Sequence, residues 1–258
     1  MVNLNKNCGL DIKLDSQKYS LIFGQGLNFS QPGVRTLSEM QELILDKSIQ
    51  EPKELYYMYR DVYRICDKSL LDEYKLRYDV TLIKPDCLGR ELMKTAGHYH
   101  PGDFGELYEV VYGRCFCLLQ RPDHANHQII EEAIICEAKA GQKIVIPAGF
   151  GHILINPGPD YLVTSNWVSN SFSSEYELYK KARGAAYFFF KSSGKKLEFI
   201  PNPYFKQAAK LKFVKPSPRL DKFGLIENDP IYPLINKDAK KLDFLNYPID
   251  YSYKDIFI

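Results

Sequence analysis

The chain has 258 residues, a net charge of +2 and 45% hydrophobic residues. This composition is that of a globular protein with a substantial core, and it excludes a disordered polymer. Lys and Arg gather between Lys191 and Lys222, but acidic residues elsewhere nearly balance them, so we expect no nucleic-acid partner. No apolar run reaches the roughly 18 residues that a membrane-spanning helix needs, so we expect no membrane partner either.

The six cysteines include no Cys-x-x-Cys pair, which argues against a zinc ribbon or a thioredoxin-like site. Cys115 and Cys117 would share one face of a strand and are expected in the core. The N-terminus lacks a basic start followed by an apolar stretch. These features together favour a reducing compartment, and we expect a cytoplasmic protein.

The first part of the chain alternates between irregular segments and short regular elements. Residues 1–33 are expected to form an N-terminal extension with a strand, closed by the turn residues Gln31-Pro-Gly33. Apolar residues at helical spacing then predict a short helix that is capped by Thr36 or Ser38. A tyrosine-rich segment at residues 56–63 predicts a strand.

A run of short strands fills residues 78–167. The predicted strands are Val80–Ile83, Leu107–Tyr112, Cys115–Leu119, Gln128–Cys136, Ile144–Ile146, His152–Asn156 and Tyr161–Trp167. Turn residues separate them and helix is scarce, so the fold class is all-β, a sandwich or small barrel. A helical stretch at residues 174–183 follows. The proline-rich tail, residues 191–258, is expected to be an extended arm on the barrel or on a neighbouring subunit.

The first segment with chemical content is Thr95-Ala-Gly-His98-Tyr-His100. On a strand, His98 and His100 project from the same face because side chains alternate. Pro101-Gly102 turns the chain, so Glu106 on the returning strand comes beside the two histidines. Two imidazoles and one carboxylate around one point suit divalent iron, nickel, manganese or zinc.

The second segment is Gly141-Gln-Lys-Ile-Val-Ile-Pro147-Ala-Gly149-Phe-Gly-His152. A strand ends at Pro147, the glycines allow a tight turn, and His152 opens the next strand. If the barrel closes, His152 joins the first three ligands in a site of three histidines and one glutamate with open positions. The two remaining histidines, His124 and His127, belong to a hairpin tip and are expected at the surface.

These two segments read His-x-His-x5-Glu-x6-Gly and Gly-x5-Pro-x-Gly-x2-His-x3-Asn, and they resemble the two motifs of the cupin superfamily. The second segment fits at every position. In the first, the loop before Glu106 is longer than usual, and Leu92 stands where a glycine is expected. The resemblance implies a cupin jelly-roll barrel with flanking helices that binds one divalent metal per subunit. The implied ligands are His98, His100, Glu106 and His152.

A closer resemblance is to the cupin-type glucose-6-phosphate isomerases, which are metal-dependent enzymes. It rests on residues 35–40, on 81–85, on Thr95 to Tyr108, and on Glu175-Tyr176 with 183–187. It covers residues 34–190, the expected isomerase domain, and leaves 191–258 as a C-terminal extension. The resemblance implies interconversion of glucose 6-phosphate and fructose 6-phosphate in glycolysis or gluconeogenesis. It further implies iron as the first choice of metal, and a homodimer.

The resemblance also implies roles near the metal. Glu106 is the candidate base that removes the C2 proton through an enediol; in a second route a hydride moves directly between C1 and C2. Tyr108 hydrogen-bonds a sugar oxygen or relays a proton. His152 is counted with Glu106 and Tyr108 among the catalytic residues.

The phosphate needs hydrogen-bond donors. Gly97 allows close approach of a backbone N–H, and Thr81 and Thr95 offer hydroxyls. The resemblance places these three residues at the phosphate end together with Tyr56. A small shift in the match would put Tyr57 or Tyr59 in the place of Tyr56. Tyr176 is a further expected substrate contact.

One departure from the family concerns the segment before Tyr176. Family members carry a histidine there, whereas this chain reads Asn170-Ser-Phe-Ser-Ser-Glu-Tyr176. The departure leaves three readings: a lower activity, a replacement such as Ser174, or a different sugar phosphate. The alternative functions are an iron dioxygenase, which an apolar pocket would favour, and a sugar-binding cupin without catalytic activity.

Overall fold

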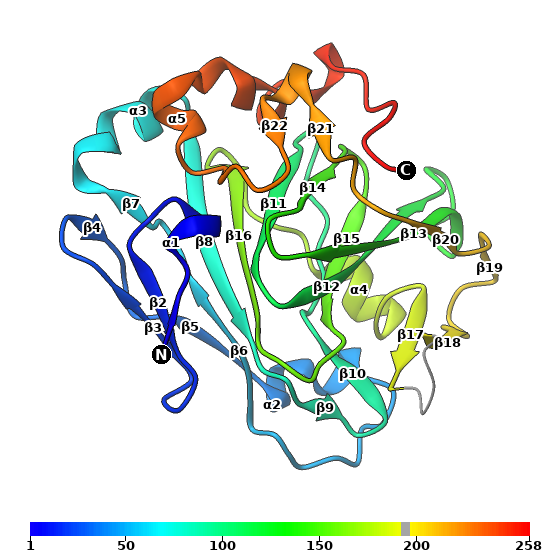
Figure 1. Ribbon diagram of the computed structural model, residues 1–258. Helices are drawn as coiled ribbons and strands as arrows, with labels where there is room; N and C mark the ends of the chain where they lie inside the picture. The colour runs from blue at the N-terminus through cyan, green and yellow to red at the C-terminus, as the bar shows by residue number, and fades with distance from the viewer. Residues whose placement is uncertain (192–196) are drawn as a thin grey trace.

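The computed structural model describes residues 1–191 and 197–258 (Figure 1). Residues 192–196, which are part of the predicted C-terminal extension, lie outside the described residues. In the described part of the chain, no helix is both long enough and apolar enough to cross a membrane.

Eight antiparallel strands form two sheets that pack against each other. The first sheet contains, in order, β14 (Lys143–Ile146), β11 (Glu106–Tyr112), β16 (Leu162–Ser169) and β8 (Leu76–Ile83). The second contains β10 (Glu91–Lys94), β15 (Gly151–Asn156), β12 (Arg114–Pro122) and β13 (Ile129–Lys139). Residues of both sheets share one hydrophobic core. This strand order is that of an eight-stranded jelly roll, the architecture of cupins, so the predicted fold class is confirmed.

Further strands widen both sheets. The first sheet continues through β6 (Glu54–Tyr59) to β5 (Gly33–Thr36), and the second continues from β10 to β17 (Tyr187–Phe190) and β18 (Glu198–Pro201). β9 (Cys87–Leu88) also pairs with β10. All seven predicted strands of residues 78–167 are found. The prediction did not include β10, whose four residues are all buried and therefore lack the alternating pattern of a half-buried strand.

The predicted early helix is present as α2 (Leu37–Met40), followed by a 3₁₀ turn at Gln41–Leu43. Thr36 caps it: its side chain accepts a hydrogen bond from Glu39 N, while the Glu39 carboxylate accepts one from Thr36 N at 2.8 Å. This reciprocal capping box explains why the helix begins where the sequence indicated. The second predicted helix is α4 (Glu177–Ala182).

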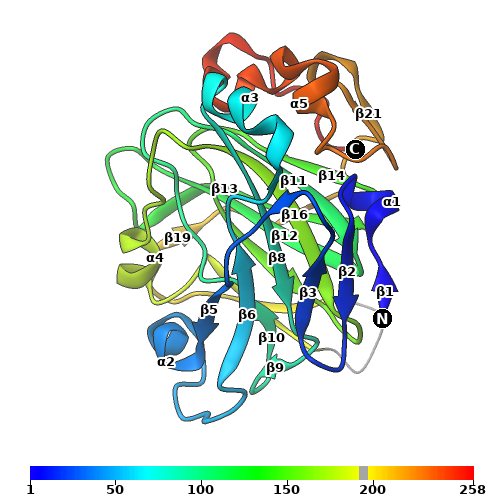
Figure 2. The same ribbon diagram turned by 90° about the vertical axis from the view of Figure 1, so that its left-hand side faces the viewer.

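The outer face of the first sheet is covered by both ends of the chain (Figure 2). At the N-terminus, β1 (Val2–Asn3), β2 (Ile12–Asp15) and β3 (Ser20–Phe23) form a small sheet, and α1 (Asn5–Cys8) lies between β1 and β2 in the chain. β4 (Leu27–Asn28) pairs with β7 (Tyr63–Arg64), which α3 (Lys68–Glu73) follows. The C-terminal Tyr232 packs on Tyr78 and Trp167, with ring centroids 5.0 and 5.6 Å away. The first sheet is therefore buried on both faces.

The C-terminal segment packs on the chain's own barrel. β19 (Gln207–Ala208) and β20 (Lys212–Val214) add parallel to β13, and a hairpin of β21 (Arg219–Leu220) and β22 (Leu225–Ile226) follows. It then forms α5 (Leu234–Lys237) and 3₁₀ turns at Ala239–Leu245 and Pro248–Asp250. The segment is thus extended in its first half and helical in its second, which the expected extended arm did not anticipate.

A buried ion pair joins the barrel to this C-terminal cover. Lys143 Nζ lies 3.2 Å from Glu109 Oε1 and donates a hydrogen bond to Ile226 O at 2.8 Å. Glu109 Oε2 accepts a hydrogen bond from Ile231 N at 3.1 Å. Burial raises the pKa of Glu109 to about 7, even though Lys143 lowers it, and burial also lowers the pKa of Lys143. Desolvation therefore outweighs the attraction between the two charges.

We predict that Glu109→Gln flattens the pH dependence of folding. Because the pKa of Glu109 is higher in the folded than in the unfolded chain, its contribution to stability is complete below about pH 4.5 and is lost by about pH 7. The free energy of unfolding of the wild type should fall by on the order of 3 kcal/mol across that range, relative to the variant. Urea unfolding of metal-free protein at several pH values measures this. Glu137→Gln, at an exposed pair with Arg114, is the control and should behave as the wild type.

Candidate metal centre

The metal-binding segments meet through the backbones of His98 and His152. His98 N donates to His152 O at 3.3 Å and His152 N donates to His98 O at 3.1 Å. His152 belongs to β15, whereas His98 and His100 lie in the extended chain after β10 and not inside a regular strand. The mutual bridge continues the pairing of β10 with β15, so the expected alternation of side chains still holds.

The four predicted metal ligands converge on one point. The Nε2 atoms of His98, His100 and His152 lie 3.7, 3.2 and 3.1 Å from Glu106 Oε2. One ligand atom from each of the four residues lies within 4.8 Å of all the others. Glu106 is the first residue of β11 in the first sheet, so ligands from both sheets meet across the barrel. We call these four residues the metal-ligand cluster.

Two hydrogen bonds orient the ligands. His100 Nδ1 lies 3.1 Å from Phe104 O; because a carbonyl only accepts, this nitrogen carries the hydrogen and Nε2 keeps its lone pair for a metal. Asn166 Nδ2 donates to Glu106 Oε1 at 2.7 Å, which leaves Oε2 facing the imidazoles. Three imidazole nitrogens and one carboxylate oxygen fit one divalent transition metal.

The electrostatics of the cluster favour the ligand forms that bind metal. Burial, together with the neighbouring His152, lowers the pKa of His98 to about 4. Burial by itself would raise the pKa of Glu106, but the three imidazoles beside it hold that pKa well below its ordinary value. A neutral imidazole and a charged carboxylate are the states that coordinate a metal.

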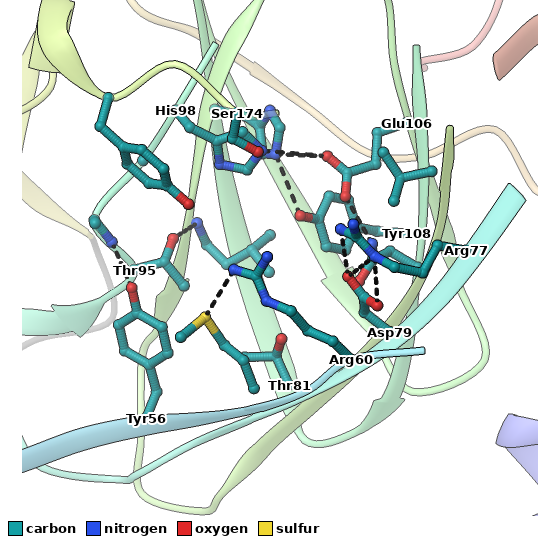
Figure 3. A pocket seen from close by; sticks show the side chains of 18 residues that line it. Tyr56, Arg60, Arg77, Asp79, Thr81, Thr95, His98, Glu106, Tyr108 and Ser174 are labelled. Atoms are coloured by element: carbon teal, nitrogen blue, oxygen red, sulfur yellow. Dashed lines mark hydrogen bonds and ion pairs between the residues drawn. The ribbon is translucent and has the colours of Figure 1, made fainter. Parts of the chain in front are cut away.

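A cavity opens beside the cluster (Figure 3). It is lined by Tyr56, Met58, Arg60, Arg77, Asp79, Thr81, Thr95, Ala96, Gly97, His98, Glu106, Tyr108, His152, Leu154, Asn166, Val168, Ser174 and Tyr176. Every residue predicted for the site lies on it except His100, which is buried beside it against Phe172 with ring centroids 4.5 Å apart. Tyr57 and Tyr59 point to the opposite face of β6. They join the hydrophobic cluster between the first sheet and the two chain ends, which we call the outer core.

The cavity wall away from the metal-ligand cluster offers hydrogen-bond donors. Tyr56 Oη accepts from Ala96 N at 3.1 Å and Thr95 Oγ1 accepts from Leu154 N at 3.0 Å. Each of these oxygens already accepts a backbone bond, so each hydroxyl hydrogen is free to be donated into the cavity. We call Tyr56, Thr81, Thr95 and Gly97 the donor cluster.

Gly97 could not be another residue without a change in the backbone. Its φ is +77°, and an added Cβ would lie 2.4 Å from Ile153 Cγ2. Its N–H forms no hydrogen bond with any residue that the structure describes. The position therefore leaves a free donor beside the hydroxyls of Thr81 and Thr95, as the sequence analysis expected of a phosphate site.

Four polar residues of the cavity were missed by the sequence analysis: Arg60, Arg77, Asp79 and Asn166. Arg77 Nε donates to both Asp79 oxygens, at 2.9 and 3.0 Å, and both side chains face the cavity from β8. Their signal in the sequence is alternation, because Arg77, Asp79 and Thr81 fall on one face of a strand. The predicted strand began at Val80, four residues after the true start of β8 at Leu76, so it left out Arg77 and Asp79.

The segment without the family's histidine lies across the metal-ligand cluster. Tyr99 and Glu175 exchange backbone hydrogen bonds of 2.9 and 2.8 Å, which places this segment beside the first motif. Ser174 lines the cavity, and the Tyr176 ring lies 5.8 Å from the ring of His98. Arg35 packs on the other side of Tyr176, with its Cζ 5.9 Å from the ring centroid.

Comparison with known proteins gives one family. Residues 34–206 match the family model for glucose-6-phosphate isomerase (GPI). The chain is 30% identical over 154 residues to a glucose-6-phosphate isomerase of Thermococcus litoralis, covering 55% of this chain and 75% of that protein. It is 30% identical over 131 residues to a glucose-6-phosphate isomerase of Pyrococcus abyssi, covering 49% of this chain and 64% of that protein.

Solved structures of low similarity also align with part of the chain. An oxalate oxidase is 16% identical with a TM-score of 0.32, over 40% of this chain and 46% of that chain. Vicilin from hazelnut, Corylus avellana, is 16% identical with a TM-score of 0.36, over 48% of this chain and 33% of that chain.

We predict that His152→Ala abolishes metal binding while the fold survives. The variant removes one of four ligands but keeps the backbone bridge to His98, which does not depend on the side chain. Bound metal measured by inductively coupled plasma mass spectrometry should drop to background, with an unchanged circular dichroism spectrum. His124→Ala, at the exposed hairpin tip, is the matched control and should keep its metal. Full occupancy in His152→Ala would show that this residue is not a ligand.

Asn166→Ala should weaken metal binding without removing a ligand. The substitution frees Glu106 Oε1, so the carboxylate loses the bond that orients it. Loss of such a supporting contact lowers metal affinity by about 10- to 100-fold. Competition with a chromogenic chelator measures the dissociation constant. An unchanged constant would mean that Asn166 does not orient Glu106.

Proposed function

The chain belongs to the glucose-6-phosphate isomerase family, and we propose that it interconverts glucose 6-phosphate and fructose 6-phosphate in the cavity described above. One observation carries the proposal: a single cavity joins the metal-ligand cluster to the donor cluster. A phosphorylated sugar has a phosphate that only accepts hydrogen bonds from such donors and, at its other end, a carbonyl that a metal can polarise. The two clusters match the two ends of such a molecule.

The donor cluster would hold the phosphate. The free hydroxyl hydrogens of Tyr56 and Thr95 and the free N–H of Gly97 have no competing acceptor among the described residues. Hydrogen bonds to an ionised acceptor are stronger than those between neutral groups. Tyr176 lines the same cavity with its ring 5.8 Å from the ring of His98, so we assign it a contact with the sugar.

The metal-ligand cluster would hold one divalent metal per subunit, and we propose iron, with nickel, manganese and zinc as alternatives for the same ligands. A bound metal supplies polarisation of the carbonyl and stabilisation of the negative charge that develops beside it. The pKa of Glu106 is well below its ordinary value, so its carboxylate is ionised and can accept the C2 proton, although the same low pKa makes it a weak base.

Tyr108 lies beside the base. Its hydroxyl is 3.3 Å from His152 Nε2, and burial next to Glu106 raises its pKa well above the ordinary value. Tyr108 therefore keeps its proton and can donate it to a sugar oxygen.

Isomerisation in D2O separates the enediol route, which incorporates deuterium, from a direct hydride shift, which does not.

An isomerase for another sugar phosphate is the second candidate function. Ser174 stands in the cavity wall where the family resemblance leads us to expect a histidine nearby, and charged side chains line the opposite wall. A dioxygenase would call for an apolar substrate pocket, and the charged side chains of Arg60, Arg77 and Asp79 in this lining disfavour that function. A sugar-binding cupin without activity would be expected to lack ligands, whereas all four are together here.

Two further properties are part of the proposal. All six cysteines are free thiols, which supports a reducing, cytoplasmic location. The homodimer expected from the family resemblance also remains a proposal, which analytical ultracentrifugation can test.

We predict metal-dependent isomerisation of fructose 6-phosphate. Purified protein should form glucose 6-phosphate in an assay coupled to its oxidation by a dehydrogenase. Chelation should abolish the activity because the carbonyl is then no longer polarised, and divalent iron should restore it. Absence of turnover with each of the four metals would overturn the function, and turnover of another sugar phosphate alone would favour the second candidate.

A further inference from the structure

Arg60 is one of three charged residues of the cavity, with Arg77 and Asp79, that the sequence analysis did not include. It directly follows β6, and alternation along that strand places it on the same face as Tyr56 and Met58. Figure 3 shows its side chain extending into the cavity, toward the side on which Tyr56 and Thr95 lie. A long cationic side chain thus lines the same cavity as the donor cluster.

Arg60 lies near Asp79, since its charge opposes the rise that burial causes in the pKa of Asp79. The Asp79 carboxylate, however, forms its hydrogen bonds with Arg77 and Asp61 N. The one hydrogen-bond contact of the Arg60 guanidinium is with Met58 Sδ at 3.8 Å, and a thioether is a weak acceptor. It forms no ion pair with any residue in the described part of the chain. The other arginine of the cavity, Arg77, is held instead by both oxygens of Asp79. Of the two, Arg60 is the one free to bind a ligand.

The donor cluster also lacks a charge of its own. Its hydroxyls and backbone N–H are neutral, whereas a phosphate ester carries about −1.5 to −2 charges at neutral pH. Arg35 lies beside Tyr56 but is not among the residues that line the cavity, so within the lining Arg60 is the cation free to offset that charge. An arginine fork offers paired N–H groups that match two phosphate oxygens.

We infer that Arg60 binds the phosphate of the sugar phosphate and thereby makes the enzyme prefer phosphorylated substrates. The inference rests on the proposed function, because it assigns the phosphate to the donor cluster. In this arrangement Arg60 and the donor cluster bind the same phosphate. It acts on substrate binding and takes no part in the chemistry at C1 and C2.

The first test is kinetic. Arg60→Gln should raise KM for fructose 6-phosphate about tenfold with kcat changed less than twofold, since one charge-assisted contact is lost from both the bound substrate and the transition state. Arg60→Lys should recover part of the loss because it keeps the charge but not the fork. Arg219→Gln changes the net charge equally at an exposed pair with Asp221 and should match the wild type. Unchanged KM in Arg60→Gln would overturn the inference.

The second test does not depend on turnover. Sorbitol 6-phosphate carries the phosphate but no carbonyl, so calorimetric titration reports binding alone. Wild-type protein should bind it at least tenfold more tightly at pH 8 than at pH 5, because the second phosphate proton leaves near pH 6, and Arg60→Gln should lose most of that gain.

The outcomes separate the two proposals. If the wild type binds sorbitol 6-phosphate with this dependence on Arg60 but does not isomerise fructose 6-phosphate, the inference stands and the proposed function fails. Equal affinity of wild type and Arg60→Gln, or no binding by the wild type, overturns the inference. Metal content and melting temperature of Arg60→Gln should equal those of the wild type, so a loss of affinity cannot come from misfolding.

Discussion

The mutual backbone hydrogen bonds of His98 and His152 are the constraint on which the rest of the site depends. They continue the pairing of β10 with β15 beyond the regular strand and fix the two motifs in register. A shift by one residue would turn the imidazoles to the other face. Glu106 lies on β11 in the first sheet. It meets the three histidines because the two sheets of the jelly roll pack face to face. The fold and the ligand geometry are thus set by the same strand pairing.

Side chains alternate along the strands of the first sheet, so its two faces lie in different environments. On β6, Tyr56 faces the cavity whereas Tyr57 and Tyr59 face the outer core. On β8, Arg77 faces the cavity and Tyr78 packs under Trp167 and Tyr232. The outer face is apolar and would be unstable if it were exposed to water, so other parts of the chain must pack against it. The two chain ends provide that cover, and the polar inner face is free to carry substrate contacts.

The sequence predicted what depends on local spacing and missed what depends on register. The metal ligands fall in two segments whose turns and alternation can be recognised, and Thr36 with Glu39 marks the start of α2. Asn166 could not be assigned in this way, because it meets Glu106 only through the pairing of β16 with β11. The C-terminal cover is held by contacts such as Lys143 with Ile226, which are distant in sequence. Long-range pairings of this kind leave no periodic signal in the segments they join.

The hydrogen-bonding character of the cavity changes from one end to the other, and this gives the substrate a direction. The imidazole lone pairs and the carboxylate of the metal-ligand cluster can bind a cation. The free hydroxyl hydrogens of the donor cluster can donate hydrogen bonds to an anion. A sugar phosphate bound in reverse would place its carbonyl among the donors and away from the metal ligands, where a metal could not polarise it. The free guanidinium of Arg60 strengthens the same polarity from the first sheet. Where the family resemblance leads us to expect a histidine, the segment from Asn170 to Tyr176 contains no cationic side chain. Orientation in this chain therefore comes from the donor cluster together with Arg60.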